Sequence, residues 1–125
     1  MVTEKNSRLR ELATSDRIEA FFRSLGRAAT KPCRVYLTGG VTAVLLGFRP
    51  TTVDIDLTIH PESDEILRAI PRLKEELRLN VELAAPHHFI PALPGWQERS
   101  RFIRQEGPVA LFHYDLHAQV GGNRA

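Results

Sequence analysis

The chain has 125 residues, of which 42% are apolar and 26% charged, as is typical of one globular domain with a buried core. No apolar run is long enough to cross a bilayer, and the charged N-terminal sequence lacks the apolar stretch of a signal peptide, so we expect a cytoplasmic protein without a membrane partner. The single cysteine excludes an internal disulfide, and a net charge of +2 is too small to predict nucleic-acid binding by itself.

The first half of the chain predicts a helix, a strand, a short helix and a second strand. The first helix begins near Asp16, carries apolar residues at helical spacing and is expected to end at Gly26. A buried strand over residues 33–39 leads through two glycines into a short helix over residues 40–47. The next strand alternates, with one face formed by Val53, Ile55, Leu57 and Ile59 and the other by Asp54, Asp56 and Thr58.

The second half predicts an amphipathic helix after Pro61, a short strand over "NVELA", a proline-rich loop and a hairpin over residues 101–115. Pro71 is expected to kink or restart the helix. This order of elements predicts an α+β fold, with a small mixed sheet and flanking helices. We expect one domain over residues 1–125, in which residues 119–125 form a disordered tail.

Asp54 and Asp56 form an acidic pair inside an otherwise apolar strand. Because side chains two residues apart on a strand project from the same face, their like charges repel unless a cation or strong donors offset them. Paired hard oxygen ligands suit Mg²⁺, which commonly takes one or two protein carboxylates. The alternative is that both acids lie on the solvated face of a half-exposed strand.

Gly39 and Gly40 stand where the preceding strand hands over to a helix. The absence of side chains lets a phosphate approach the backbone, and the start of a helix supplies N–H donors. The hydroxyls of Thr38 and Thr42 lie nearby in the sequence. One turn could therefore hold a polyphosphate while the next strand holds the metal, although any tight strand-to-helix turn also favours glycine.

The glycine pair, thirteen intervening residues and "DID" with apolar flanks resemble the signature of the nucleotidyltransferase superfamily with the DNA polymerase beta-like fold. The stretch "TGGVTAVLLGFRPTTVDIDLTI" is most similar to the minimal nucleotidyltransferases, including toxin-type members of toxin–antitoxin and abortive-infection systems. Arg49, together with Thr51 and Thr52, also matches these relatives, and the resemblance covers about residues 33–118.

The resemblance implies a metal-dependent transfer of a nucleoside monophosphate from a nucleoside triphosphate to an acceptor hydroxyl on RNA, a protein or a small molecule. It implies nucleotide contacts at Gly39, Gly40, Thr42 and Arg49. It also implies that Asp54 and Asp56 bind Mg²⁺ or Mn²⁺ as catalytic metal ligands, in a two-metal clamp on the entering and leaving oxygens.

A third catalytic carboxylate is expected on a neighbouring strand, and the sequence offers two candidates. Glu82, a metal ligand in this assignment, lies on the strand after the long helix, whereas Asp115 ends the hairpin. A chain of this length has little room for a separate acceptor-binding domain, so a homodimer mate or protein partner is a candidate for that role. The alternative function is a non-catalytic nucleotide-binding or antitoxin-like module that acts through protein association.

Arg99, Arg101 and Arg104 form a basic cluster in the sequence before and within the hairpin. We interpret them either as a solvated face or as contacts to a triphosphate or an RNA backbone. If RNA is the acceptor, this segment is the expected source of backbone contacts.

Overall fold

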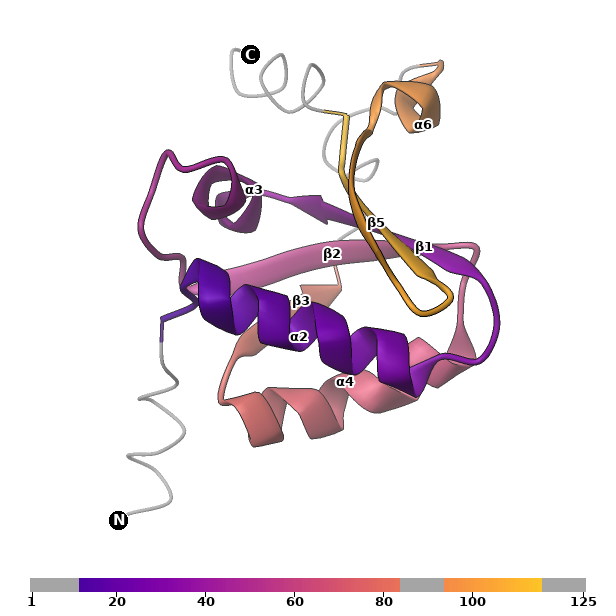
Figure 1. The fold of residues 1–125 in the computed structure, drawn as a ribbon, viewed down its shortest axis with the longest axis horizontal. Helices are drawn as coiled ribbons and strands as arrows, with labels where there is room; N and C mark the ends of the chain where they lie inside the picture. Colours follow the sequence, from indigo (N-terminus) through magenta and orange to yellow (C-terminus); the bar gives the residue numbers. More distant parts are fainter. Residues whose placement is uncertain (1–11, 84–93, 116–125) are drawn as a thin grey trace.

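The computed structural model describes residues 12–83 and 94–115 and confirms the predicted α+β fold (Figure 1). Five strands form one mixed sheet in the order β3-β2-β1-β5-β4. The elements follow the chain as α2 (Ser15–Ala28), β1 (Cys33–Thr38), α3 (Gly40–Leu45), β2 (Asp54–His60), α4 (Asp64–Leu77), β3 (Asn80–Leu83), α6 (Trp96–Arg99), β4 (Arg101–Glu106) and β5 (Val109–His113). The predicted tail, residues 119–125, lies outside the described residues.

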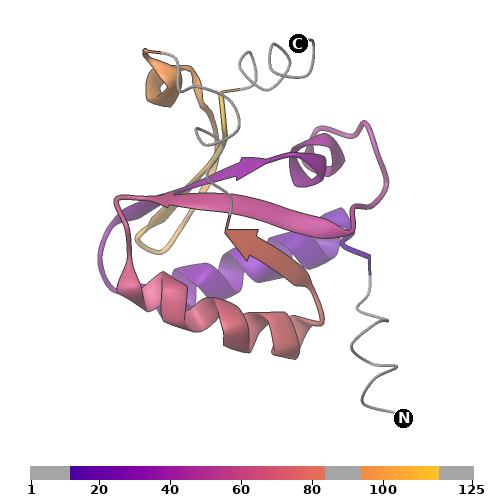
Figure 2. The same ribbon diagram turned by 180° about the vertical axis from the view of Figure 1, so that it is seen from behind.

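The central strand β1 pairs antiparallel with β2 and parallel with β5. Strand β2 pairs parallel with β3, and β4 pairs antiparallel with β5. Seen from behind, β3 lies at one edge of the sheet beside β2, and α4 runs below it (Figure 2). Among the described residues, none of the helices combines the length and the apolar character needed to span a membrane.

Helices α2 and α4 lie side by side on one face of the sheet and bury its apolar side chains (Figure 1). Each helix begins with a hydroxyl cap, since Thr14 accepts a hydrogen bond from Arg17 N at 3.3 Å and Ser63 accepts one from Ile66 N at 3.3 Å. The two helices then contribute a stripe of buried residues at helical spacing: Ile18, Phe21, Phe22 and Leu25 from α2, and Ile66, Ala69, Ile70 and Leu73 from α4.

Two details of these helices differ from the sequence-based prediction. Helix α2 does not end at Gly26 but continues to Ala28. Gly26 instead allows the β4–β5 turn to approach, because a Cβ atom there would lie 2.7 Å from the carbonyl oxygen of Glu106. Pro71 lies inside α4, which runs from Asp64 to Leu77 as a single helix rather than restarting.

The opposite face of the sheet, which we call the open face, carries the polar residues of the strands. Alternation along β2 places Asp54, Asp56, Thr58 and His60 on this face, while Ile55 and Leu57 are buried under the helices. The strand register aligns these residues with Thr38, Tyr36 and Arg34 of β1. The short helix α6 lies on this side of the sheet, away from α2 and α4 (Figure 1).

Candidate functional site

Three carboxylates gather where the β2–β3 edge meets the open face, and we call Asp54, Asp56 and Glu82 the acidic end. The register pairs Asp56 with Glu82 directly across β2 and β3, which places both side chains on the same face. Asp54 precedes Asp56 by two residues and therefore shares that face. Both aspartates are half-buried, whereas Glu82 is exposed. The fold thus brings together residues that are 28 positions apart in the sequence.

The carboxylates of the acidic end repel one another. Burial raises the pKa of the Asp56 carboxyl above its ordinary value, and the neighbouring charges of Glu82 and Asp54 raise it further. Within the described residues, none of the three forms an ion pair with a lysine, arginine or histidine. The negative charge of the acidic end is therefore not offset by the protein chain itself in residues 12–83 and 94–115.

Gly39 lies directly against the acidic end. It connects β1 to α3 with φ 77° and ψ −142°. This backbone conformation is strongly unfavourable for every residue other than glycine, because it brings the Cβ atom too close to the backbone. A Cβ atom at this position would lie 3.2 Å from Asp56 Oδ2. The preceding residue, Thr38, pairs with Asp56 in the sheet. Gly39 therefore provides the turn and lets the backbone lie close to the carboxylate of Asp56.

Gly40 has a packing role that the sequence did not reveal. A Cβ atom there would lie 2.2 Å from Thr52 Oγ1, and Thr52 is buried and bridged to Ala13. The same Cβ atom would lie 3.3 Å from Arg49 Nη1. The exposed Arg49 thus places its guanidinium group at the glycine turn, which is where the resemblance expects a nucleotide contact. Because substitution of Gly40 disturbs Thr52, Arg49 is the cleaner position for a binding test.

Thr42 turns its side chain into the protein. Its hydroxyl donates to the carbonyl oxygen of Leu37 at 3.3 Å and lies 3.2 Å from His113 Nδ1. Both Thr42 and His113 are buried, and burial, reinforced by the charge of Arg101, lowers the pKa of His113. The hydroxyl expected to contact a nucleotide therefore joins α3 to β5 in this structure.

The two candidates for the third carboxylate occupy very different surroundings. Glu82 lies beside Asp56, whereas Asp115 is fully buried. Arg99 donates two hydrogen bonds to Asp115 Oδ2, from Nε at 3.0 Å and from Nη2 at 2.7 Å. The backbone N–H of Asp115 donates to Ser100 Oγ at 2.9 Å. Asp115 therefore ties the α6 segment to the end of β5, and Glu82 is the better placed candidate.

The arginines of the hairpin segment do not form one basic patch. Arg99 is bound to Asp115, as described above, while Arg104 lies 2.8 Å from Glu106 and over the ring of Phe22. A β-bulge between Phe102 and Arg104 shifts the register and directs Arg104 to the helix-covered face. Arg99 and Arg104, which the sequence groups into one possible RNA-binding cluster, therefore lie in different parts of the structure.

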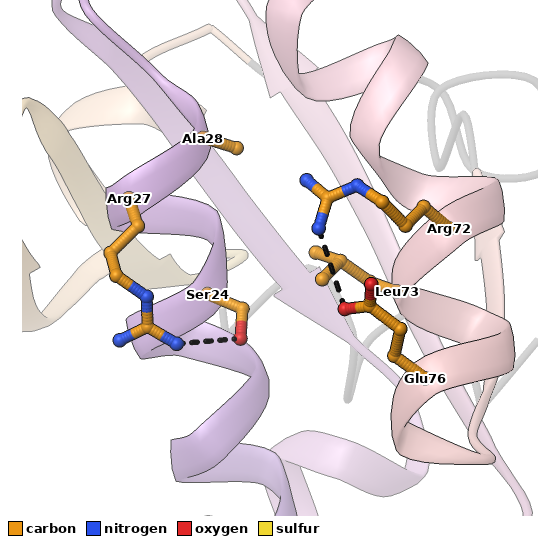
Figure 3. Close-up of a pocket in the computed structure, with 6 residues that line it drawn as sticks. All are labelled: Ser24, Arg27, Ala28, Arg72, Leu73 and Glu76. Atoms are coloured by element: carbon orange, nitrogen blue, oxygen red, sulfur yellow. Dashed lines mark hydrogen bonds and ion pairs between the residues drawn. The ribbon is translucent and has the colours of Figure 1, made fainter.

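A separate hollow of about 250 Å³ lies between α2 and α4, on the helix side of the sheet (Figure 3). Its polar side chains pair among themselves, since Arg72 lies 3.4 Å from Glu76 and Arg27 donates to Ser24 at 3.2 Å. These groups are surface residues of two helices, and the hollow has no connection to the acidic end.

The carboxylate oxygens of the acidic end are the type of donor that a hard divalent cation such as Mg²⁺ prefers. Among residues 12–83 and 94–115, no three His, Cys, Asp or Glu side chains are arranged to hold one ion by themselves. Asp54 and Asp56 nevertheless offer paired oxygen donors, and Mg²⁺ commonly uses one or two carboxylates together with water and phosphate oxygens. A cation would also relieve the repulsion that, after burial, contributes to the raised pKa of Asp56.

No protein-family model, curated protein or solved structure matches this chain.

Proposed function

We propose that the acidic end binds a nucleoside triphosphate with Mg²⁺ or Mn²⁺, and that the protein transfers the nucleoside monophosphate to an acceptor hydroxyl. One observation carries the proposal: Asp54, Asp56 and Glu82 lie together without ion-pair partners among the described residues, directly beside the Gly39 turn. Clustered like charges destabilise a fold, so their placement on the open face calls for a cationic ligand.

Each residue has a role that follows from its position. Asp54 and Asp56 would hold the metal together with phosphate and water oxygens, and Glu82 would add negative charge from the neighbouring strand. Gly39 brings a turn without a side chain close to Asp56, so that phosphate oxygens could approach the backbone there, and Arg49 supplies a cation at the same turn. We do not assign the phosphate site to the start of α3, because this helix has only six residues.

The reaction is a displacement at the α-phosphorus of the nucleotide. The acceptor oxygen forms a bond to this phosphorus, the bond to the bridging oxygen of the β-phosphate breaks, and pyrophosphate leaves. The proton of the acceptor hydroxyl passes to a carboxylate of the acidic end. Bound Mg²⁺ would neutralise phosphate charge and stabilise the entering and leaving oxygens. The chain itself positions the nucleotide through Arg49 and the glycine turn.

Titration calorimetry with Mn²⁺, with ATP and with both tests the binding step. We expect weak Mn²⁺ binding that strengthens in the presence of ATP, because the nucleotide contributes the remaining oxygen ligands. The double variant Asp54→Asn/Asp56→Asn should abolish this cooperativity. Asp64→Asn is the matched control, since Asp64 is an exposed acid in the first turn of α4. Arg49→Gln should weaken ATP binding while leaving Mn²⁺ binding unchanged.

Transfer is measured with nucleoside triphosphates labelled at the α-phosphate, using total RNA and the protein itself as acceptors. Label incorporated by the wild type and lost at least hundredfold in the double variant supports the enzyme. Nucleotide binding without transfer to any acceptor favours the non-catalytic module. Identical heats for the wild type and the double variant would contradict both functions.

A further inference from the structure

His113 is a buried polar residue at the end of β5 that the proposed function does not use. It shares a face of the strand with Val109 and Leu111, two residues of the main core, and is only 4% exposed. A buried imidazole needs a hydrogen-bond partner, because an unsatisfied polar group in the core costs stability. Thr42 of α3, which lies 71 positions away in the sequence, is such a partner.

The contacts of the Thr42 hydroxyl indicate which group donates. Thr42 Oγ1 lies 3.3 Å from the carbonyl oxygen of Leu37 and 3.2 Å from His113 Nδ1. A hydroxyl has a single hydrogen, so both hydrogen bonds form together only if it donates to the carbonyl and accepts from His113 Nδ1–H. Burial and the charge of Arg101 lower the pKa of His113, which keeps its ring neutral at neutral pH. The arrangement therefore favours the neutral ring with its hydrogen on Nδ1.

Thr42 closes the glycine turn with two hydrogen bonds. Its backbone N–H donates to the carbonyl oxygen of Gly39 at 3.1 Å, and its hydroxyl donates to the carbonyl oxygen of Leu37. Gly39 thus lies inside a loop that Thr42 fastens at both ends. Because glycine has more conformational freedom than any other residue, neighbouring contacts are needed to keep this turn in one conformation.

His113 links the closed turn to the sheet. Strand β5 pairs in parallel with β1, and His113 lies opposite Leu37 in this register. The other neighbour of β1 is β2, where a Cβ atom at Gly39 would lie 3.2 Å from Asp56 Oδ2. A continuous series of contacts therefore leads from His113 through Thr42 and the Gly39 turn to the acidic end.

We propose that His113 is a positioning residue, which donates its Nδ1 hydrogen to Thr42 and thereby holds the Gly39 turn in place beside Asp56. The inference rests on the proposed function for its last step, in which the fixed turn receives the phosphates of the nucleotide. It gives the Thr42 hydroxyl a role inside the protein, in place of the nucleotide contact that the resemblance implies. Loss of the hydrogen bond would loosen the turn and weaken nucleotide binding, while the carboxylates stay in place.

Nitrogen-15 NMR of the histidine rings, without metal or nucleotide, tests the hydrogen bond directly. In the wild type, His113 should have its hydrogen on Nδ1 at neutral pH. Thr42→Val keeps the shape of the side chain but removes the hydroxyl, so it should shift His113 toward the Nε2–H tautomer. Thr42→Ser keeps the hydroxyl and should preserve the tautomer of the wild type. The amide hydrogen of residue 42 should exchange faster in Thr42→Val than in Thr42→Ser.

Two amide side chains at position 113 test where the donor must lie. The amide nitrogen of asparagine is as many bonds from Cα as Nδ1 of histidine, whereas that of glutamine is one bond further. His113→Asn should therefore keep the hydrogen bond to Thr42, and His113→Gln should lose it. In calorimetry with Mn²⁺ and ATP, we expect ATP affinity near that of the wild type for His113→Asn and about tenfold weaker for His113→Gln. Mn²⁺ binding without ATP should be unchanged in both.

Ile66→Val is the control for a general loss of stability. Ile66 is fully buried in the first turns of α4 and has no contact with the glycine turn in the hydrogen-bond series described above. The variant should melt at a lower temperature than the wild type, because it removes a buried methyl group. Its ATP affinity in the presence of Mn²⁺ should be unchanged. Across the variants, ATP affinity should thus follow the presence of the donor at position 113 and not the melting temperature.

The possible failures are distinguishable. An Nε2–H tautomer of His113 in the wild type, or equal ATP affinities of His113→Asn and His113→Gln, would overturn the inference and leave the proposed function intact. A wild type that binds no ATP with Mn²⁺ would refute the proposed function, and amide exchange at residue 42 would then decide on the turn itself. Faster exchange in His113→Gln than in His113→Asn would support the positioning role, and equal rates would overturn it.

Discussion

Asp56 lies in β2 and Asp115 just after β5, the two strands that flank β1, yet their carboxylates have opposite electrostatic surroundings. Asp115 is fully buried and receives two hydrogen bonds from Arg99. Asp56 is half-buried, and burial, followed by the charges of Glu82 and Asp54, raises its pKa. One carboxylate is neutralised within the chain, and the other stands among like charges.

The comparison separates a structural acid from a candidate ligand. A buried carboxylate that is matched by its own arginine contributes to holding the fold, here by joining α6 to β5. In the acidic end, burial and the charges of Glu82 and Asp54 raise the pKa of Asp56, so the ionised Asp56 costs stability as long as no cation is bound. The third carboxylate of the candidate site is therefore better sought at Glu82 than at Asp115.

The largest effect is expected for Asp115→Asn. The substitution removes the charged partner of Arg99 and should lower the free energy of unfolding by about 2 kcal/mol. Chemical denaturation measures this change in the free energy of unfolding. Glu98→Gln is the control, because Glu98 is an exposed acid next to Arg99 in α6. If Asp115→Asn instead keeps full stability but loses nucleotide transfer, Asp115 would belong to the functional site rather than act as a structural acid.

Asp56→Asn should raise the free energy of unfolding at neutral pH, by less than Asp115→Asn lowers it. The pKa of Asp56 is raised in the folded protein, so the folded state binds more protons than the unfolded state between the ordinary and the raised value. Stability is therefore lost as the pH rises through this window, and at neutral pH the variant should melt at a higher temperature than the wild type. The difference should shrink in acid and when Mn²⁺ is added. A lower melting temperature at neutral pH would show that Asp56 is itself a structural acid.

The smallest effect concerns Glu82→Gln. Removing this charge should lower the pKa of Asp56, but it should remain above the ordinary value, because burial is the larger cause of the shift. Carbon-13 NMR of the aspartate carboxyl groups across a pH titration measures the change. Asp115 serves as the internal reference and should not respond. An unmoved Asp56 would mean that Glu82 is too distant to share a ligand with it.

Local patterns in the sequence determined the elements and the acidic pair. The alternation along β2 places Asp54 and Asp56 on one face because a strand reverses its side chains at every residue. The order of helices and strands likewise predicted an α+β fold with a mixed sheet, which the structure confirms. Both results depend only on residues close together in the chain.

The tertiary structure alone decided which distant residues meet. The parallel register of β2 and β3 placed Glu82 beside Asp56, and the packing of α6 gave Asp115 its arginine. Gly26 illustrates the same limit, since it allows close packing of the β4–β5 turn instead of ending α2. Strand register, bulges and close contacts arise from packing between segments far apart in the sequence, and no local pattern of residues encodes them.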